Sequence, residues 1–276
     1  MGDKPYEQLT IRDHFMFGKV CQDETNAQII LRALLNEDIT VKTTEVEKFL
    51  NDTKSGKFVR LDLLAKDEFD VIYNAELQHY SNKERTEELP RRSRYYQSLI
   101  DANNIPKRKH YKDIPDVYVI FVCTYDPFGF DLPQYTFKTK CIEADIPNFD
   151  DGINRIFFNT TADLRSLPLK TQNMLKYIGT GSTSDTETKF LEDIINDARV
   201  KEIWRNEYML TFVHDKDVYL DGYDSGYDSG SVLGAINNTI SLYLKGKLKK
   251  ADAMEELSLS ESDFEDAVTK YQAELT

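Results

Sequence analysis

Two adjacent stretches, Lys57-Phe-Val-Arg-Leu-Asp-Leu-Leu-Ala65 and Asp70-Val-Ile-Tyr-Asn-Ala-Glu-Leu-Gln78, carry the strongest structural signal in the sequence. Each is rich in β-branched, aromatic and other apolar residues, which favour strands. The short charged segment Lys66-Asp67-Glu68 lies between them and is interpreted as a turn. The two stretches therefore predict an antiparallel hairpin, and the rest of the domain is interpreted around it.

The register of this hairpin places two acidic residues opposite each other. With the turn centred near residue 69, Asp62 lies opposite Glu76. Side chains alternate between the two faces of a strand, so Asn74, Glu76 and Gln78 share one face and are expected to turn away from the core. The opposite face of the second strand is apolar and is expected to be buried: Val71, Tyr73, Ala75 and Leu77.

Two carboxylates that face each other repel unless positive charge lies between them. A divalent cation supplies that charge, and oxygen ligands completed by water suit Mg²⁺ or Mn²⁺. The alternative is an ordinary solvated hairpin face on which Arg60 balances the acids, and the pattern leaves both interpretations open. Repulsion also predicts that removing either carboxylate stabilises the metal-free protein slightly.

The segments around the hairpin alternate between helix and strand patterns. Residues 10–36 show helical apolar spacing, and a further helix follows the hairpin, with Pro90 expected in its first turn. The apolar run Val117–Cys123 is typical of a strand covered on both faces. Shorter strands are predicted at 135–142 and 155–158, and helices over 169–213 with a loop at 179–185. This order predicts a mixed α/β domain.

A separate region follows at the C-terminal end. Residues 221–230, Asp-Gly-Tyr-Asp-Ser-Gly-Tyr-Asp-Ser-Gly, repeat with a period of four, and their glycines disfavour an isolated helix. The repeat is interpreted as a flexible linker, or as a stripe of small residues that lets a partner backbone approach. Three short helices are predicted after it. The expected divisions are a main domain at 1–215, a linker at 216–231 and a helical C-terminal module at 232–276.

Composition restricts the class of protein. Of the 276 residues, 40% are hydrophobic and 12% are aromatic, which suffices for a large core and excludes a disordered chain. The three cysteines are scattered and form no disulfide framework or C-x-x-C metal motif, so a reducing, cytoplasmic location is expected. No apolar run approaches the roughly 18 residues of a membrane span, so no membrane association is expected.

Charge is unevenly distributed along the chain. The net charge of −13 and the pI of about 4.9 exclude a protein that coats nucleic acid by bulk electrostatics. Residues 81–112 nevertheless hold nine basic and four acidic side chains, a local net charge of +5. This basic stretch is compatible with local phosphate binding, and a solvated helix face is the alternative.

Histidine supplies no recognisable motif. The four histidines are far apart in the sequence and lack H-x-x-x-H or H-N-H spacing: His14, His79, His110 and His214. A surface or packing role is expected for each.

Several short motifs, taken in order, resemble one nuclease family. They are Asp13-His-Phe-Met-Phe-Gly-Lys-Val20, Leu61-Asp-Leu-Leu-Ala65, Ala75-Glu-Leu-Gln78, Arg91-Arg-Ser-Arg-Tyr-Tyr96 and Ile114-Pro-Asp-Val-Tyr-Val-Ile120. Asp62, thirteen further residues and Glu76-Leu-Gln78 resemble the PD-(D/E)xK nuclease pattern, with Gln in place of the usual Lys. More narrowly, the chain resembles the Rpn family of recombination-promoting nucleases, also described as PD-(D/E)xK family transposases.

The resemblance implies a restriction-endonuclease-like α/β core with a mixed central sheet flanked by helices, plus a small helical C-terminal module. It implies a metal-dependent DNA endonuclease that hydrolyses phosphodiester bonds and serves recombination or mobile-element transfer. Asp62 and Glu76 would bind Mg²⁺ or Mn²⁺, and Gln78 would complete the catalytic set where the family carries lysine. Asp13 is a further candidate metal ligand, and capping of the first helix is the alternative role for it.

The expected partners follow from the charge pattern. Arg91, Arg92 and Arg94 lie in the basic stretch and are the expected DNA-binding residues. The C-terminal module is acidic, which favours homo-oligomerisation over DNA contact. One alternative concerns the whole chain: a catalytically silent descendant that uses the nuclease fold as a protein-interaction module, which the acidic net charge favours.

Overall fold

A computed structural model describes residues 4–51, 58–79, 83–104, 110–147, 149–210, 237–257 and 259–274. The chain divides into two compact units, residues 1–205 and residues 206–276. The repeat at 221–230 and the linker predicted at 216–231 lie outside the described residues. The candidate site lies in the first unit, which is described first.

A mixed six-stranded sheet forms the centre of this unit, with the strand order β1-β2-β3-β4-β6-β5. The strands β3, β4 and β6 run parallel to one another, and the other neighbours pair antiparallel. The bounds are β1 Val41–Asn51, β2 Phe58–Asp67, β3 Ile72–Gln78, β4 Val117–Cys123, β5 Gln134–Phe137 and β6 Ile153–Asn159. The predicted α/β class is confirmed, and so is the predicted hairpin of β2 and β3.

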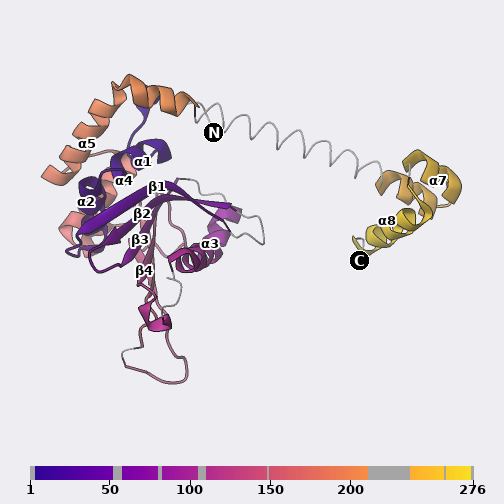
Figure 1. Cartoon of the computed structure of the whole chain (residues 1–276), viewed down its shortest axis with the longest axis horizontal. Helices are drawn as coiled ribbons and strands as arrows, with labels where there is room; N and C mark the ends of the chain where they lie inside the picture. The colour runs from indigo at the N-terminus through magenta and orange to yellow at the C-terminus, as the bar shows by residue number, and fades with distance from the viewer. Residues whose placement is uncertain are drawn as a thin grey trace. The chain divides into compact units, whose positions relative to one another are not determined.

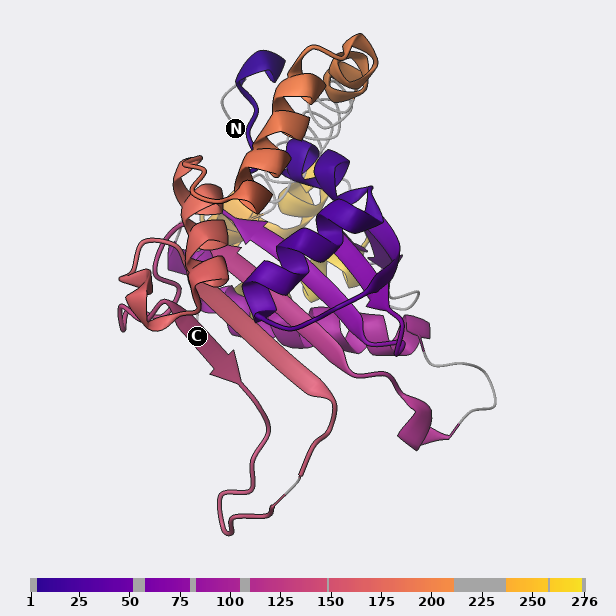
Figure 2. The same cartoon turned by 90° about the vertical axis from the view of Figure 1, so that its left-hand side faces the viewer.

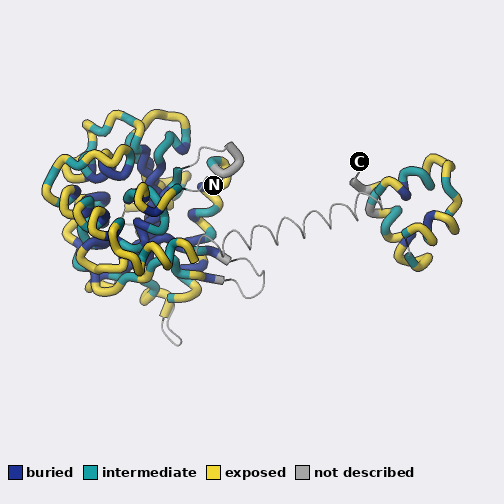
Figure 3. Tube along the Cα trace, turned by 90° about the horizontal axis from the view of Figure 1, so that it is seen from above, coloured by how far each residue is buried: buried dark blue, intermediate teal, exposed yellow. Residues whose placement is uncertain are grey.

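Helices cover both faces of the sheet (Figures 1 and 2). The long helix α3 (Lys83–Asn104) lies on one side, and α1 (His14–Cys21), α2 (Glu24–Leu35), α4 (Leu169–Thr180) and α5 (Thr186–Arg199) lie on the other. Residues 202–210 form a further helix. Figure 3 shows the buried positions, in dark blue, running through the middle of this unit. Burial on both faces explains why β4 reads as a continuous apolar run.

The structure differs from the sequence prediction at three places, and the first two differences have simple causes. The helix expected over 10–36 is two helices, because the Asp23 carboxylate accepts from the Thr25 and Asn26 amides and starts α2 anew. Strand β1 was missed because most of its residues are exposed or half-buried, as on a sheet edge. The strand predicted at 135–142 ends at Phe137.

Helix α3 begins earlier than the proline signal indicated. Pro90 lies inside the helix rather than in its first turn, and it is exposed. The buried apolar residues of α3 are Leu89, Tyr96, Leu99 and Ile100, which pack on a core that includes Phe121 of β4. Apolar packing of this face supplies the stability that a proline inside a helix removes.

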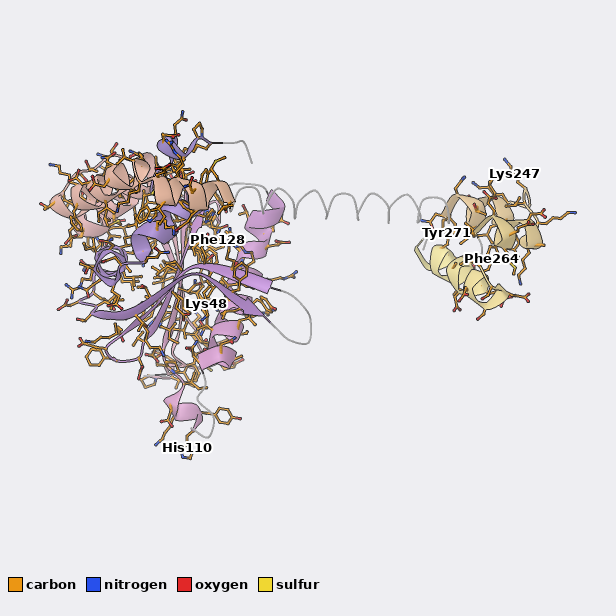
Figure 4. The ribbon with its side chains drawn as sticks, turned by 45° about the horizontal axis from the view of Figure 1, so that its top comes forward. Lys48, His110, Phe128, Lys247, Phe264 and Tyr271 are labelled. Atoms are coloured by element: carbon orange, nitrogen blue, oxygen red, sulfur yellow. The ribbon has the colours of Figure 1, made fainter. Side chains whose placement is uncertain are left out.

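The second unit has its own small apolar core. Residues 237–244 are helical, and α7 (Lys250–Leu257) and α8 (Glu261–Glu274) follow. Phe264 of α8 is buried against Ile240 and Ala253, and Tyr271 packs on the same cluster (Figure 4). Ser260 caps α8 by accepting from the Asp263 amide. Among the described residues of the chain, no helix is long and apolar enough to cross a membrane.

Candidate active site

The hairpin strands separate at the two predicted carboxylates. Pairing of β2 with β3 runs from Lys66–Ile72 to Leu63–Ala75, which is the register that a turn near residue 69 predicts. One position further on, side chains replace the ladder bonds. The Asp62 amide donates to Glu76 Oε1 at 3.0 Å, and the Leu77 amide donates to Asp62 Oδ2 at 2.9 Å. Each carboxylate therefore satisfies a backbone amide of the opposite strand. We call the Asp62 and Glu76 carboxylates, together with the two amides that donate to them, the fork.

The polar face of β3 is buried, unlike the sequence expectation that it turns away from the core. Asn74 is 0%, Glu76 2% and Asp62 7% exposed, because α3 packs over the face that Asn74 and Glu76 share and His14 of α1 approaches Asp62. Asn74 Nδ2 donates to Glu76 Oε1 at 2.7 Å and to the Leu63 carbonyl at 3.1 Å. Alternation of side chains is a local pattern, whereas the packing of α3 over this face is not.

Burial changes the acidity of Glu76. Loss of water around the carboxylate raises the pKa of Glu76 well above its ordinary value, and the nearby charge of Asp62 raises it further. The hydrogen bonds from Asn74 and from the Asp62 amide act in the opposite direction but do not cancel the increase. In the absence of a cation, the site therefore favours a neutral Glu76 beside Asp62.

Two histidines lie near the fork. His14 has a role beyond the predicted surface or packing one because it bonds to Asp62, whereas His79 keeps a packing role. His14 Nδ1 lies 3.0 Å from Asp62 Oδ2, and the hydrogen bond to Asp62 raises the pKa of His14. The His79 ring packs edge-on against it, with ring centroids 6.1 Å apart, and burial lowers the pKa of His79. His110 lies on a projecting loop (Figure 4), and His214 is outside the described residues.

Asp13 lies at the start of α1 next to His14 but points back along the chain. Its Oδ2 accepts from the Thr10 amide at 2.7 Å and forms an ion pair with Lys4. Asp13 occupies the N-cap position without a capping hydrogen bond from its side chain. The contacts described for the Asp13 side chain therefore lie with Thr10 and Lys4, and not with Asp62 or with the first amides of α1. The charge of Asp13 nevertheless acts on His14.

Gln78 ends β3 and meets α3. Its Nε2 donates to the Leu77 carbonyl at 2.8 Å, and its Oε1 accepts from Arg92 Nη1 at 3.0 Å. Arg92 Nη2 also donates to the Tyr96 hydroxyl at 3.0 Å. The three predicted DNA-binding arginines therefore diverge: Arg92 is half-buried at the site, whereas Arg91 and Arg94 are exposed.

The donor atoms at the fork suit a hard divalent cation. Asp62 and Glu76 offer carboxylate oxygens, and Mg²⁺ is commonly held by one or two carboxylates with water in the other positions. Asn74 Oδ1 is buried and has no donor among the described residues, which fits a hydrated cation beside Glu76. No group of three or more His, Cys, Asp or Glu in the described part of the chain is arranged to hold a metal. The chain would thus supply two carboxylates and water the rest.

Comparison with known families gives a match over the residues that build this site. Residues 12–162 match the model of the PD-(D/E)XK nuclease family transposases. The match covers more than half of the chain and includes α1, the fork and Arg92. The chain belongs to this family. No curated protein and no solved structure matches it.

Family membership agrees with the architecture. The mixed sheet with helices on both faces is consistent with a PD-(D/E)XK nuclease-like fold. PD-(D/E)XK nucleases generally use divalent metal ions, and a nuclease family implies a DNA substrate. The second unit lies outside the matched residues.

Sequence reasoning assigned no role at the site to His14 or Asn74, and it did not predict the contact of Arg92 with Gln78. Asn74 had a usable signal, because it precedes Glu76 by two positions and shares its face. His14 had a weaker one, since it directly follows Asp13 at the start of the helix expected near the site. The Arg92–Gln78 contact had none, because it depends on how α3 packs against the end of β3.

Proposed function

We propose that the protein is a metal-dependent DNA endonuclease that hydrolyses phosphodiester bonds and serves recombination or mobile-element transfer. The observation that supports this most is the fork, where two buried carboxylates face each other and burial disfavours charge on Glu76. Such a pair is poised to gain from a bound cation. The description of the family as transposases supports the role in recombination.

The roles of the residues follow from their contacts. Asp62 and Glu76 would hold Mg²⁺ or Mn²⁺, and their hydrogen bonds to backbone amides fix the orientation of both carboxylates. When bound, the ion lowers the pKa of an attacking water and stabilises charge on a phosphoryl oxygen. His14 orients Asp62, and Asn74 orients Glu76. Gln78 completes the catalytic set at the end of β3.

A plasmid-nicking assay tests the proposal. Supercoiled plasmid is incubated with the full chain and increasing Mg²⁺ or Mn²⁺, with EDTA as the control. We expect open-circular and linear products that require the metal. An intact plasmid at all metal concentrations would favour the alternative, a silent nuclease fold that binds protein, which the net charge of −13 favours.

Arg91 and Arg94 are proposed to contact DNA phosphates away from the fork. Both are exposed on α3, one on either side of Arg92. Replacing both with Ala should weaken DNA binding and reduce the slope of log K against log salt by roughly one unit per lost contact. Fluorescence anisotropy of a labelled duplex at several salt concentrations measures this slope. Arg165→Ala, an exposed arginine paired with Asp163, is the matched control, and an equal slope in all variants would contradict the assignment.

The acidic second unit is proposed to mediate homo-oligomerisation rather than DNA contact. Its helical core is separate from that of the first unit. A chain that ends at Leu220 should therefore retain the melting temperature of the full protein within a few degrees. Light scattering should show fewer chains per particle than in the full protein. A truncated chain that fails to fold would contradict this division. So would a truncated chain that assembles with the same number of chains as the full protein.

A further inference from the structure

The proposed reaction would gain from positive charge in addition to that of the metal, and neither Gln78 nor the carboxylates provide it. Hydrolysis of a phosphodiester builds negative charge on the phosphoryl oxygens, and donors fixed in advance near those oxygens lower the barrier. Asp62 and Glu76 add negative charge, and Gln78 is neutral. Arg60, two positions before Asp62, lies 3.9 Å from Glu47, and its charge acts on His14. A cation on the Gln78 side of the site would come from another element.

Arg92 is such a cation. It extends from α3 to the end of β3, where Nη1 donates to Gln78 Oε1 at 3.0 Å. Its charge acts on Glu76 in the direction that favours the ionised carboxylate, which places the guanidinium in the electrostatic environment of the fork. Because Gln78 and Glu76 are on the same face of β3, the guanidinium lies on the side of the sheet that carries the site.

The surroundings of Arg92 hold the guanidinium in one orientation. Nη2 donates to the Tyr96 hydroxyl at 3.0 Å, and the guanidinium carbon lies 5.5 Å from the Tyr96 ring centre and 5.7 Å from that of Phe121. Two aromatic rings and two hydrogen bonds restrict a side chain that is otherwise flexible. A positioned guanidinium gives up little entropy when it binds an anion.

The guanidinium keeps donors for a further ligand. It carries five N–H groups, and the bonds to Gln78 and Tyr96 use two of them among the described residues. The side chain is half-buried rather than enclosed. The planar guanidinium presents paired N–H donors whose spacing matches that of two phosphate oxygens. A lysine ammonium has no such pair of parallel donors.

We propose that Arg92 is the residue that contacts the scissile phosphate, and that Gln78 acts through Arg92 by holding its guanidinium in place. This inference rests on the proposed nuclease function and changes the role given to Gln78, which becomes a positioning residue. Arg92 thereby differs from its exposed neighbours Arg91 and Arg94, which meet the DNA backbone elsewhere.

The first test is a double-mutant cycle measured as the rate of plasmid nicking at saturating Mg²⁺. Arg92→Gln should lower kcat about 100-fold or more, and Arg92→Lys should retain part of the activity. Gln78→Leu should lower kcat about tenfold in the wild-type background and have no further effect when Arg92 is already Gln. Arg165→Gln is the control for loss of an arginine. If the fold-loss in kcat of the double variant equals the product of the two single fold-losses, the role of Gln78 is overturned.

The second test observes contact without cleavage. The guanidinium signals of arginine-labelled protein are recorded by NMR before and after adding a short DNA duplex, with Ca²⁺ in place of Mg²⁺. The Arg92 signals, assigned with Arg92→Gln, should shift with DNA in the wild type and shift less in Gln78→Leu. Bound DNA with unshifted Arg92 signals would overturn the contact, and so would a duplex that does not bind at all. Shifted signals in a protein that does not nick would support the contact while contradicting the nuclease proposal.

Metal binding and folding separate this role from a merely structural one. Arg92→Gln and Gln78→Leu should bind Mn²⁺ by calorimetry within a few-fold of the wild type, because neither supplies a carboxylate. Their nicking should fall in kcat with little change in KM. A fall in activity that follows only a lower melting temperature would assign Arg92 to packing against Tyr96 and Phe121 and overturn the proposal.

Discussion

Asp62→Asn is expected to lower the rate of plasmid nicking at least a thousandfold while leaving the chain folded. Asn keeps an oxygen that accepts from the Leu77 amide but removes the negative charge that would hold the metal. A thousandfold loss corresponds to about 4 kcal/mol in the activation barrier. The nicking rate, the melting temperature and the affinity for Mn²⁺ measured by calorimetry check the three parts of this prediction.

Asp62→Ala should be equally inactive and also less stable. It leaves the buried Leu77 amide and the His14 ring without their acceptor, which costs about 1–3 kcal/mol for an unsatisfied buried donor. Asp67→Asn is the matched control, because Asp67 is another buried acid of β2 whose partners are the Phe69 and Val71 amides and the Tyr73 hydroxyl. It should keep the nicking activity. Wild-type nicking by Asp62→Asn would show that the site has been misplaced.

Glu76→Gln is expected to abolish metal-dependent nicking and to stabilise the metal-free protein at neutral and alkaline pH. The folded-state pKa of Glu76 is raised, so between its unfolded value near 4.5 and the folded value the folded state binds more protons than the unfolded state. The free energy of unfolding of the wild type therefore falls as pH rises through that window. Gln does not titrate, so it removes this fall, and one pKa unit corresponds to about 1.4 kcal/mol.

Urea unfolding in EDTA at pH 5 and pH 8 measures the effect. The free energy of unfolding of Glu76→Gln should exceed that of the wild type at pH 8, and the difference between them should be smaller at pH 5. His14 contributes a second fall, because its pKa is also raised: its stabilisation is complete below 6.5 and is lost as pH rises through the folded value. The fall from Glu76 begins near pH 4.5, so the two windows start at different pH. Equal pH profiles for wild type and Glu76→Gln would contradict the assignment.

The hairpin was predictable because local signals in the sequence determine its register. Alternation and a turn near residue 69 are local signals, and they give the register that pairs Leu63 with Ala75. The same local reasoning failed where packing over long sequence distances decides. It expected the Asn74–Glu76 face to point away from the core, whereas α3 covers it.

The approach of His14 to Asp62 spans 48 positions in the chain and follows from how α1 packs on β2. Repulsion between Asp62 and Glu76 was foreseeable, but not their bonds to the facing amides. With these bonds known, we expect stabilisation for Glu76→Gln but not for Asp62→Ala. The sequence thus predicted that Asp62 and Glu76 meet across the hairpin, as they do. Their environment required the packed structure.

The fork makes two peptide amides respond directly to the state of the site. The amide hydrogen of Asp62 points at Glu76, and that of Leu77 points at Asp62. Protonation of either carboxylate, or its engagement by a cation, changes the field at one of these two hydrogens. Two cross-peaks of an ordinary nitrogen-15 spectrum should therefore act as separate reporters for the two acids, so that the order in which they lose protons or take up metal is readable without any probe attached to the protein.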